Sequence, residues 1–195
     1  MSRTGRVERA TSETKVTVSV DLDGEGRYQI DTGIPFFDHM LSHVAKQGLL
    51  DVTIEAKGDL EVDFHHTVED VGLSLGDAFA QALGNKIGTR RYGSASLPME
   101  EAIADVAVDF GGRPYLVYRV ELTQEKVGGF DVSLAKEFLR SFANRCGMNL
   151  HVTVRYGEDS HHVLEAIFKG FGLALRDAVS VDPRRRDVPS TKGTL

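Results

Sequence analysis

The sequence predicts an α+β fold built from a duplicated ββαβα unit, and two observations lead to this prediction. Alternating apolar runs of strand length recur around segments with apolar residues at helical spacing, and their order in the first half repeats in the second. The two longest helical segments also align, HHTVEDVGLSLGDAFAQAL from His65 with HHVLEAIFKGFGLALRDAV from His161. The aligned identities are His65/His161, His66/His162, Glu69/Glu165, Gly76/Gly172, Ala78/Ala174 and Ala82/Ala178.

The first half-repeat is assigned to residues 1–95 and begins with a predicted hairpin. Residues 16–22 (VTVSVDL) alternate as a half-buried strand does, the DGEG segment that follows is a turn, and residues 27–31 form the return strand. The remaining elements are expected in the order helix 37–48, strand 51–56, short extended stretch 60–64 and helix 65–83.

The second half-repeat, residues 96–195, follows the same order and ends in a C-terminal substrate-binding tail. Residues 101–110 and 115–122 are predicted strands on either side of the turn GGRP. The unit is completed by a helix over 134–145, a strand over 149–156 and a helix over 163–179. The two halves are expected to form one compact domain.

The composition indicates a globular protein and narrows its function. Of 195 residues, 41% are hydrophobic, which is enough for a sizeable core. The formal net charge of -6 disfavours a general nucleic-acid binder, which needs a basic surface. No apolar run reaches the roughly 18 residues of a membrane span, and the N-terminus lacks the apolar stretch of a signal peptide. With a lone cysteine, Cys146, expected to be buried and inert, a cytoplasmic protein without disulfides or membrane contact is predicted.

The doubled His-His-x-x-Glu motif predicts a pair of metal sites. At the start of a helix, residues i and i+4 share a face, whereas residue i+1 lies about 100° around the axis. In the first motif, His65 and Glu69 are therefore expected to hold one ion, while His66 points toward another. The second motif repeats this arrangement with His161, Glu165 and His162.

Two matching motifs favour metal binding, although a single histidine at a helix start is more often a capping or packing residue. Histidine and glutamate ligands without a cysteine cluster suit a borderline or hard ion. Mn²⁺ fits an octahedral site of nitrogen and oxygen ligands, and Zn²⁺, Fe²⁺, Co²⁺ or Ni²⁺ could substitute. His39 and His43, four residues apart on a predicted helix, add a ligand, a substrate contact or both.

Basic and hydroxyl side chains in three further segments indicate an anion site. Arg90 and Arg91 follow the first long helix, the GGRP turn holds Arg113, and the tail contains PSTKG from Pro189. Such side chains bind a phosphate through charge-assisted hydrogen bonds. The arginine run over 184–186 is interpreted instead as a solvated surface or an inter-subunit contact.

With these motifs the chain closely resembles the imidazoleglycerol-phosphate dehydratase family of histidine biosynthesis. The matching segments span nearly the whole chain in the family's order and are TGIPFFDHML (32–41), DFHHTVEDVG (63–72), GGRPY (111–115), HHVLEAIFK (161–169) and PSTKG (189–193). The resemblance implies that each half is a four-stranded sheet with two helices packed on one face. It also implies a large hollow homo-oligomer of about 24 chains, with active sites at subunit junctions.

The resemblance implies two Mn²⁺ per subunit. One ion would take His39, His66, His161 and Glu165, and the other would take His65, Glu69 and His162. Family members often supply a further ligand to the second ion with a histidine on the helix before the second motif, where this sequence has Glu137. Because carboxylates also ligate Mn²⁺, Glu137 is kept as a predicted ligand.

The resemblance further implies substrate contacts and an acid/base group. Glu13 matches a family glutamate near the substrate, and either Glu13 or a metal-bound glutamate, Glu69 or Glu165, is the candidate for proton transfer. The phosphate is the expected partner of the basic and hydroxyl residues. The predicted substrate-binding set is Glu13, His39, His43, Arg91, Arg113, His161, Lys169, Ser190, Thr191 and Lys192.

The implied hydro-lyase reaction converts imidazole glycerol phosphate to imidazole acetol phosphate and water. The proton to be removed lies on a carbon without an adjacent carbonyl, so the ring is expected to bind as an imidazolate across both metals, which act as Lewis acids. Two other classes stay open on the residues alone. The same ligands could serve a binuclear metal hydrolase, and small α/β modules also bind nucleic acids, which the acidic net charge opposes.

Overall fold

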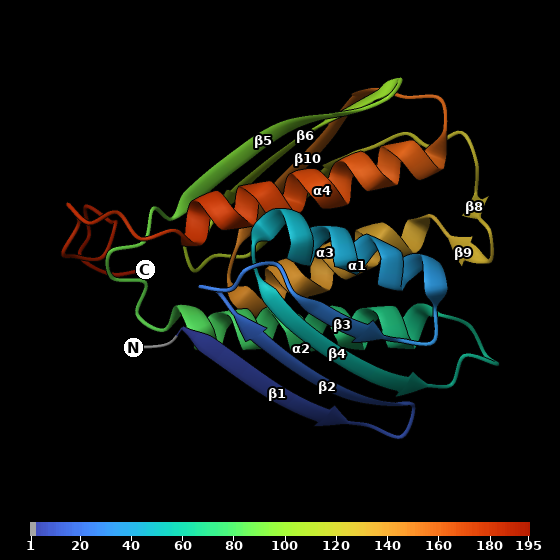
Figure 1. Cartoon of the computed structure of the whole chain (residues 1–195), viewed down its shortest axis with the longest axis horizontal. Coiled ribbons are helices and arrows are strands. Elements are labelled where there is room, and N and C mark those ends of the chain that lie inside the picture. Colours follow the sequence, from blue (N-terminus) through green and yellow to red (C-terminus); the bar gives the residue numbers. More distant parts are fainter. Residues whose placement is uncertain (1–2) are drawn as a thin grey trace.

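The computed structural model describes residues 3–195 and places four helices between two four-stranded sheets (Figure 1). The first sheet has the order β1 (Thr4–Ala10), β2 (Thr14–Asp21), β4 (Asp51–Gly58) and β3 (Tyr28–Asp31). The second sheet has the order β5 (Tyr92–Met99), β6 (Ala102–Asp109), β10 (Asn149–Tyr156) and β7 (Tyr115–Arg119). Corresponding strands occupy corresponding places, which confirms the duplication.

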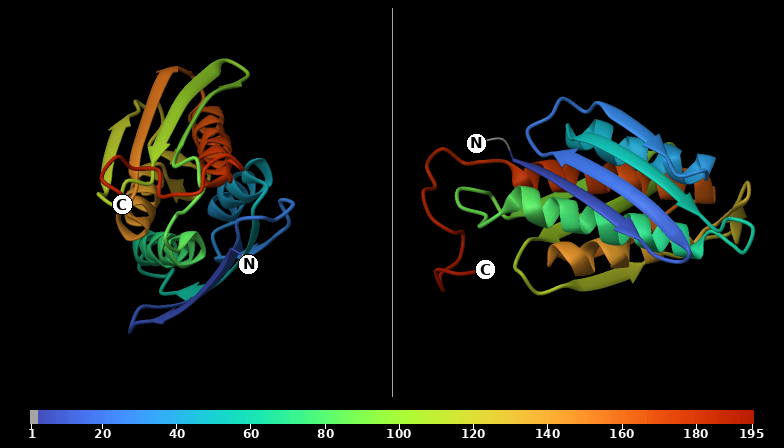
Figure 2. Two further views of the ribbon diagram at one scale, coloured as in Figure 1. Left: turned by 90° about the vertical axis from the view of Figure 1, so that its left-hand side faces the viewer. Right: turned by 90° about the horizontal axis from the view of Figure 1, so that it is seen from below.

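The helices interlock the two halves of the chain. The first half supplies α1 (Pro35–Gly48) and α2 (His65–Leu83), and the second supplies α3 (Ser133–Cys146) and α4 (Ser160–Val179). Each long helix, α2 or α4, packs on the sheet of its own half, whereas α1 lies against α4 and α3 lies against α2. Figure 2 shows the result as a central helical layer with one sheet on either side. The predicted fold class, two sheets of four strands with two helices each, is confirmed.

The buried faces follow from the alternation and the helical spacing in the sequence. In β2, Val16, Val18 and Val20 all point into the core, at 2% exposure or less. Between the helices, aromatic rings pack on one another, as with Phe142 edge-on to Phe171 at 5.3 Å between ring centroids. Cys146, the last residue of α3, is buried as predicted.

Glycines set how closely the helices approach the sheets and each other. A Cβ added at Gly5 of β1 would lie 2.0 Å from the carbonyl oxygen of Ala78 in α2, and one at Gly93 of β5 would lie 2.0 Å from that of Ala174 in α4. The aligned alanines of the repeat therefore mark equivalent contacts between a helix and an edge strand. No side chain larger than hydrogen fits at the two strand positions.

The aligned glycines make the equivalent contact between helices. A Cβ at Gly76 of α2 would lie 2.7 Å from the carbonyl oxygen of Phe142 in α3, and one at Gly172 of α4 would lie 2.7 Å from that of Val44 in α1. Each long helix thus touches the backbone of its neighbour at the same point of the repeat.

The predicted ββαβα unit lacked one strand in each half, because the observed unit is βββαβα. The missed strands, β1 and β5, are edge strands whose fully buried positions are the glycines, so they show little apolar alternation. The predicted hairpin of the first half was also wrong, and the two strands flanking the GGRP turn do not pair with each other either. Strand β3 pairs in parallel with β4, and β7 with β10, whereas the hairpins are β1–β2 and β5–β6. Alternation identifies a strand but not its partner.

Three smaller differences concern connections. Residues 60–64, predicted as extended, form a turn in which Val62 N–H donates to the Asp59 carbonyl. A short hairpin, β8 (Lys126–Val127) with β9 (Phe130–Asp131), was not predicted. Strand β5 runs across the proposed division between residues 95 and 96.

Across residues 3–195, none of the helices is both long and apolar enough to cross a membrane.

We expect Gly76→Ala and Gly172→Ala to lower the urea midpoint of unfolding. Overpacking against a backbone carbonyl costs about 1–3 kcal/mol, which exceeds the roughly 1 kcal/mol that alanine gains over glycine as a helix former. The matched control is Gly129→Ala, because a Cβ there meets nothing within 4 Å. A midpoint unchanged in both helix variants would contradict the close approach.

Candidate active site

One cluster of polar side chains forms around the carboxylate of Glu165, in the second turn of α4. Glu165 is only 6% exposed. Its Oε1 accepts hydrogen bonds from Nε2 of His39 and of His161, each at 3.0 Å. Its Oε2 accepts from the Lys169 ammonium at 2.5 Å and lies 3.5 Å from Nε2 of His43. We call these five residues the Glu165 cluster; helix α1 supplies two of them and helix α4 three.

The surroundings of Glu165 keep its carboxylate ionised. Burial raises the pKa of Glu165, but hydrogen bonds from Lys169, His39 and His161 outweigh burial and lower the pKa to about 2. Burial also lowers the pKa of the His43 imidazole below its ordinary value. The cluster therefore presents an anionic oxygen ligand beside a histidine that favours its neutral form.

A second cluster joins α2 to α3. His65 and Glu69 share one face of α2, with His65 Nε2 and Glu69 Oε2 3.9 Å apart. Glu137 of α3 completes the group, because ligand atoms of all three residues lie within 4.8 Å of one another. The Glu137 carboxylate also accepts hydrogen bonds from Arg140. We call His65, Glu69 and Glu137 the Glu69 cluster.

The second histidine of each motif points to a different carboxylate. Nδ1 of His66 hydrogen bonds to Asp59 at 3.0 Å, and Nδ1 of His162 hydrogen bonds to Glu101 at 2.7 Å. These hydrogen bonds raise the pKa of both imidazoles. Because Nδ1 is engaged, Nε2 is the nitrogen that each ring offers to a metal. Glu13 Oε2 lies 3.8 Å from His66 Nδ1.

One chain does not gather either predicted ligand set in one place. The Glu165 cluster holds three of the four residues predicted for the first ion, without His66, and the Glu69 cluster holds those predicted for the second, without His162. Among residues 3–195, the histidine that each set lacks is found with Asp59 or with Glu101 and Glu100. The ligand assignment stays a prediction.

The donor atoms of the two clusters fit an ion such as Mn²⁺. Both clusters offer imidazole nitrogens and carboxylate oxygens, the mixture that suits Mn²⁺. Adjacent ligands of an octahedral ion with bonds of about 2.1 Å lie about 3 Å apart. In the Glu165 cluster, Nε2 of His39 lies 3.0 Å from Glu165 Oε1 and 3.2 Å from Nε2 of His43. A metal ion could therefore replace the protons of these two hydrogen bonds with little movement of the three side chains.

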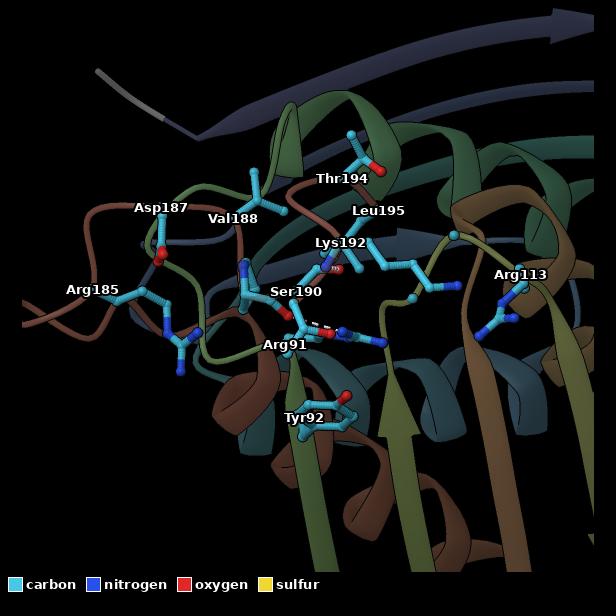
Figure 3. A pocket seen from close by; sticks show the side chains of 14 residues that line it. Arg91, Tyr92, Arg113, Arg185, Asp187, Val188, Ser190, Lys192, Thr194 and Leu195 are labelled. Atoms are coloured by element: carbon cyan, nitrogen blue, oxygen red, sulfur yellow. Dashed lines mark hydrogen bonds between the residues drawn. The ribbon is translucent and has the colours of Figure 1, made fainter.

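Five of the six basic and hydroxyl residues predicted for the anion site, all except Arg90, which pairs with Asp177, line one pocket of about 780 Å³ between the C-terminal tail and the ends of β5 and β6 (Figure 3). They are Arg91, Arg113, Ser190, Thr191 and Lys192. The pocket also includes Tyr92 and Arg185, which were not predicted. Residues 184–186 are all exposed, which agrees with the interpretation of the arginine run as a solvated surface, and Arg184 pairs with Asp182.

Arg91 fastens the tail to the second sheet. Its guanidinium donates to both carboxylate oxygens of Asp109, at 2.6 and 3.1 Å. It also donates to the carbonyl of Pro189 at 2.8 Å, a hydrogen bond drawn as a dashed line in Figure 3. Its side chain is only 13% exposed. Arg91 is therefore largely neutralised by Asp109 and shapes the pocket, while Arg113 and Lys192 carry the more exposed positive charges.

The pocket and the Glu165 cluster lie at opposite ends of α4. The backbone N–H of Arg91 donates to the carbonyl of Ala178 near the end of α4, whereas His161 is in its first turn. At 1.5 Å per residue, these positions are about 25 Å apart along the helix axis. In Figure 1 the tail lies at the left of the molecule, and α2 and α4 both begin at the right.

The sequence matches a known protein family over most of its length. The sequence model of the family described as imidazoleglycerol-phosphate dehydratase matches residues 32–175. The chain belongs to the imidazoleglycerol-phosphate dehydratase family. The Trichlorobacter lovleyi protein of that name is 55% identical over 195 residues, the whole of both chains, and the Clostridium botulinum protein is 53% identical over 97% of each.

Solved structures of dehydratases from this family share the fold. The Staphylococcus aureus imidazoleglycerol-phosphate dehydratase superimposes with a TM-score of 0.84 at 35% identity, covering 92% of this chain and 99% of that one. The Pyrococcus furiosus enzyme, crystallised in complex with (S)-C348, gives 0.82 at 36% identity, covering 97% and 100%. A binuclear hydrolase, left open by the residues alone, finds no support in these comparisons.

Sequence reasoning missed the carboxylates that hold the second histidine of each motif. Asp59 lies six residues before the first motif, so its contact with His66 could have been predicted from the short separation in the sequence. Glu101 lies about 60 residues before His162 and reaches it only because the β5–β6 turn closes over the start of α4. Such a contact requires the topology.

We expect Arg91→Lys to release the C-terminal tail. A lysine keeps the charge but cannot hold both Asp109 oxygens and the Pro189 carbonyl at once. Trypsin should then cut after the arginines at 184–186 several-fold faster. The matched control is Arg155→Lys, which disrupts a similar two-bond pair with Asp105 on the second sheet without touching the tail. Equal cleavage rates in both variants would show that Arg91 does not anchor the tail.

Proposed function

We propose that the chain dehydrates imidazole glycerol phosphate with two bound metal ions, in an active site assembled from more than one copy of the chain. The observation that carries this proposal is the pair of His/Glu clusters built by one duplicated motif in a full-length member of the dehydratase family. Mn²⁺, the homo-oligomer and a cytoplasmic location were each predicted from the sequence and stay predictions.

The two clusters are the proposed metal sites. Glu165 with His39 and His161 would hold one ion, and Glu69 with His65 and Glu137 would hold the other. Bound there, the ions would supply Lewis acidity toward the imidazole ring of the substrate. In the first site the hydrogen bonds from Lys169, His39 and His161 keep the Glu165 carboxylate in the ionised form, which is the form that ligates a metal ion.

The remaining residues have separate tasks at the two ends of the substrate. Arg113, Lys192 and the hydroxyls of the tail offer charge-assisted hydrogen bonds to the phosphate in the 780 Å³ pocket. Glu13 is the proposed acid/base, because its carboxylate is half exposed and lies beside a metal-motif histidine, where it can reach a bound substrate.

The distances support sharing of the site between chains. The substrate's ring and phosphorus are joined by about six bonds of roughly 1.5 Å, which reach less than half of the 25 Å that separate the two ends of α4. A ring at the Glu165 cluster therefore needs the phosphate pocket of another copy. The Nε2 atoms of His66 and His162, which lie outside the clusters of their own chain, are the natural ligands to offer a neighbour.

The direct test is a dehydration assay on purified protein whose metal content is measured in the same samples. We expect turnover of imidazole glycerol phosphate that is lost with chelator and restored by Mn²⁺. Size-exclusion chromatography with light scattering on these samples tests the shared site. A metal-loaded monomer with full activity would contradict the sharing of residues between chains.

We expect Glu69→Gln and Glu165→Gln each to remove one metal and to abolish turnover while the thermal unfolding midpoint stays close to that of the wild type. Each carboxylate is the centre of one cluster, and its amide is a much weaker ligand. The control is Asp77→Asn on α2, which pairs with Arg145 away from both clusters. Two metals and full activity in both variants would show that the ligand assignment is wrong.

We expect Lys192→Ala to raise KM about tenfold or more, because a hydrogen bond to a charged group contributes about 1.5–3 kcal/mol. Deletion of residues 188–195 should have the same effect with little loss of stability, since these residues line the pocket and none of them belongs to the hydrophobic core. Lys57→Ala, at an exposed position of β4, is the control. Unchanged kinetics after deletion would remove the tail from the active site.

A further inference from the structure

The turn between β1 and β2 carries Glu13 and has a defined shape. The backbone N–H groups of Glu13 and Thr14 both donate to the hydroxyl of Thr11, at 3.1 and 3.0 Å. The N–H of Thr11 donates in turn to the carbonyl of Thr14 at 2.9 Å. The direction in which the Glu13 carboxylate leaves the sheet therefore depends on how this turn is held.

A buried carboxylate on α2 holds both sides of that turn. Asp70 is 6% exposed. Its Oδ1 accepts a hydrogen bond from Nε of Arg9 at 2.8 Å, and its Oδ2 accepts one from the hydroxyl of Thr14. Arg9 lies near the end of β1 and Thr14 begins β2, so one side chain joins the two strands across the turn. Asp70 is the next residue after Glu69 of the metal motif.

The second repeat fills the same three positions with apolar side chains. Gly5 pairs with Val20 and Gly93 pairs with Val108, which sets the equivalence of the two hairpins. In that register Arg9 corresponds to Leu97, Thr14 to Ala102 and Asp70 to Ala166. Ala102 and Ala166 are buried, and Leu97 is partly buried against the core. The fold therefore forms at this place without a buried carboxylate.

The Arg9, Thr14 and Asp70 side chains are not required for the stability of the hairpin, so their role concerns the position of the turn. The Asp70 carboxylate loses its hydration on burial, whereas the Arg9 side chain stays 39% exposed, so the pair gives little stability relative to well-packed apolar residues. The second repeat shows the apolar solution in the same chain. In the first repeat, Arg9, Thr14 and Asp70 instead fix the position of the β1–β2 turn. Hydrogen bonds are directional and restrict the turn to one position, whereas apolar contacts are not directional and would allow several. Catalysis by a side chain depends on such placement, because a misplacement of about 1 Å can cost on the order of 100-fold in rate.

We propose that Asp70 is a positioning residue that fixes the β1–β2 turn and thereby the Glu13 carboxylate for proton transfer. This inference rests on the proposed role of Glu13 as the acid/base. Asp70 touches neither substrate nor metal in this proposal and acts only through Arg9 and Thr14.

A double-mutant cycle of Asp70→Ala with Glu13→Gln tests the proposal. On imidazole glycerol phosphate with saturating Mn²⁺, Asp70→Ala should lower kcat by about tenfold or more, with KM within about twofold and metal content unchanged. In the Glu13→Gln background, the same substitution should change kcat by less than about twofold, because the group that Asp70 positions is already gone.

Two further variants address folding and specificity. The triple variant Arg9→Leu, Thr14→Ala, Asp70→Ala copies the second repeat and should fold with a near-normal thermal midpoint, yet show the same loss of kcat. Asp77→Asn, on the same helix two turns later, should leave kcat unchanged. Hydrogen exchange of the Glu13 and Thr14 amides should be faster in Asp70→Ala, whether or not metal is bound.

Each contrary outcome has a distinct meaning. An equal loss of kcat in both backgrounds would show that Asp70 acts independently of Glu13, which overturns the proposal. Normal kcat in the triple variant would overturn it as well, and so would unchanged exchange of the two turn amides. Full activity of Glu13→Gln alone would remove the acid/base role and the inference with it. A wild-type protein that does not dehydrate the substrate at all would instead refute the proposed function, while the exchange experiment would still report on the turn.

Discussion

The close approach of helices from opposite halves of the chain is the constraint on which the rest of the structure depends. Gly76 lets α2 touch the backbone of α3, and Gly172 lets α4 touch that of α1. Those two contacts bring Glu137 to the Glu69 cluster and His39 to Glu165. Neither cluster could form within one half-repeat, because each takes residues from two helices that only this packing brings together. The duplicated chain thus forms two related sites, each between one helix of the first half and one helix of the second half.

Much of the fold could be predicted because helical periodicity is a strong local signal. The helix over 65–83 was predicted at its observed bounds, and the other three within three residues at each end. The strand partners could not be predicted, since β3 and β7 pair in parallel with strands that come later in the sequence. Edge strands built on Gly5 and Gly93 carry too little apolar pattern to be seen, because their role is to admit a helix closely.

The candidate site divides in the same way between local and tertiary information. That His65 and Glu69 share a face follows from helix geometry, and the sequence was sufficient for it. The grouping of tail, Arg91 and Arg113 in one pocket was suggested by charge and by resemblance, and the structure supplies the reason, since Arg91 bridges Asp109 and the tail. The carboxylates Asp70 and Glu101 contact residues that are distant in the sequence, so their roles could not be predicted from a local sequence pattern.

The burial of Cys146 has a practical consequence for work on this enzyme. The thiol lies in the core at the end of α3, and burial raises its pKa well above the ordinary value, so the reactive thiolate is scarce. A cysteine introduced on the surface would therefore be the one readily alkylated thiol among residues 3–195 of the folded chain. A fluorophore or spin label could be attached at a chosen place in the tail or beside the β1–β2 turn without first removing the native cysteine.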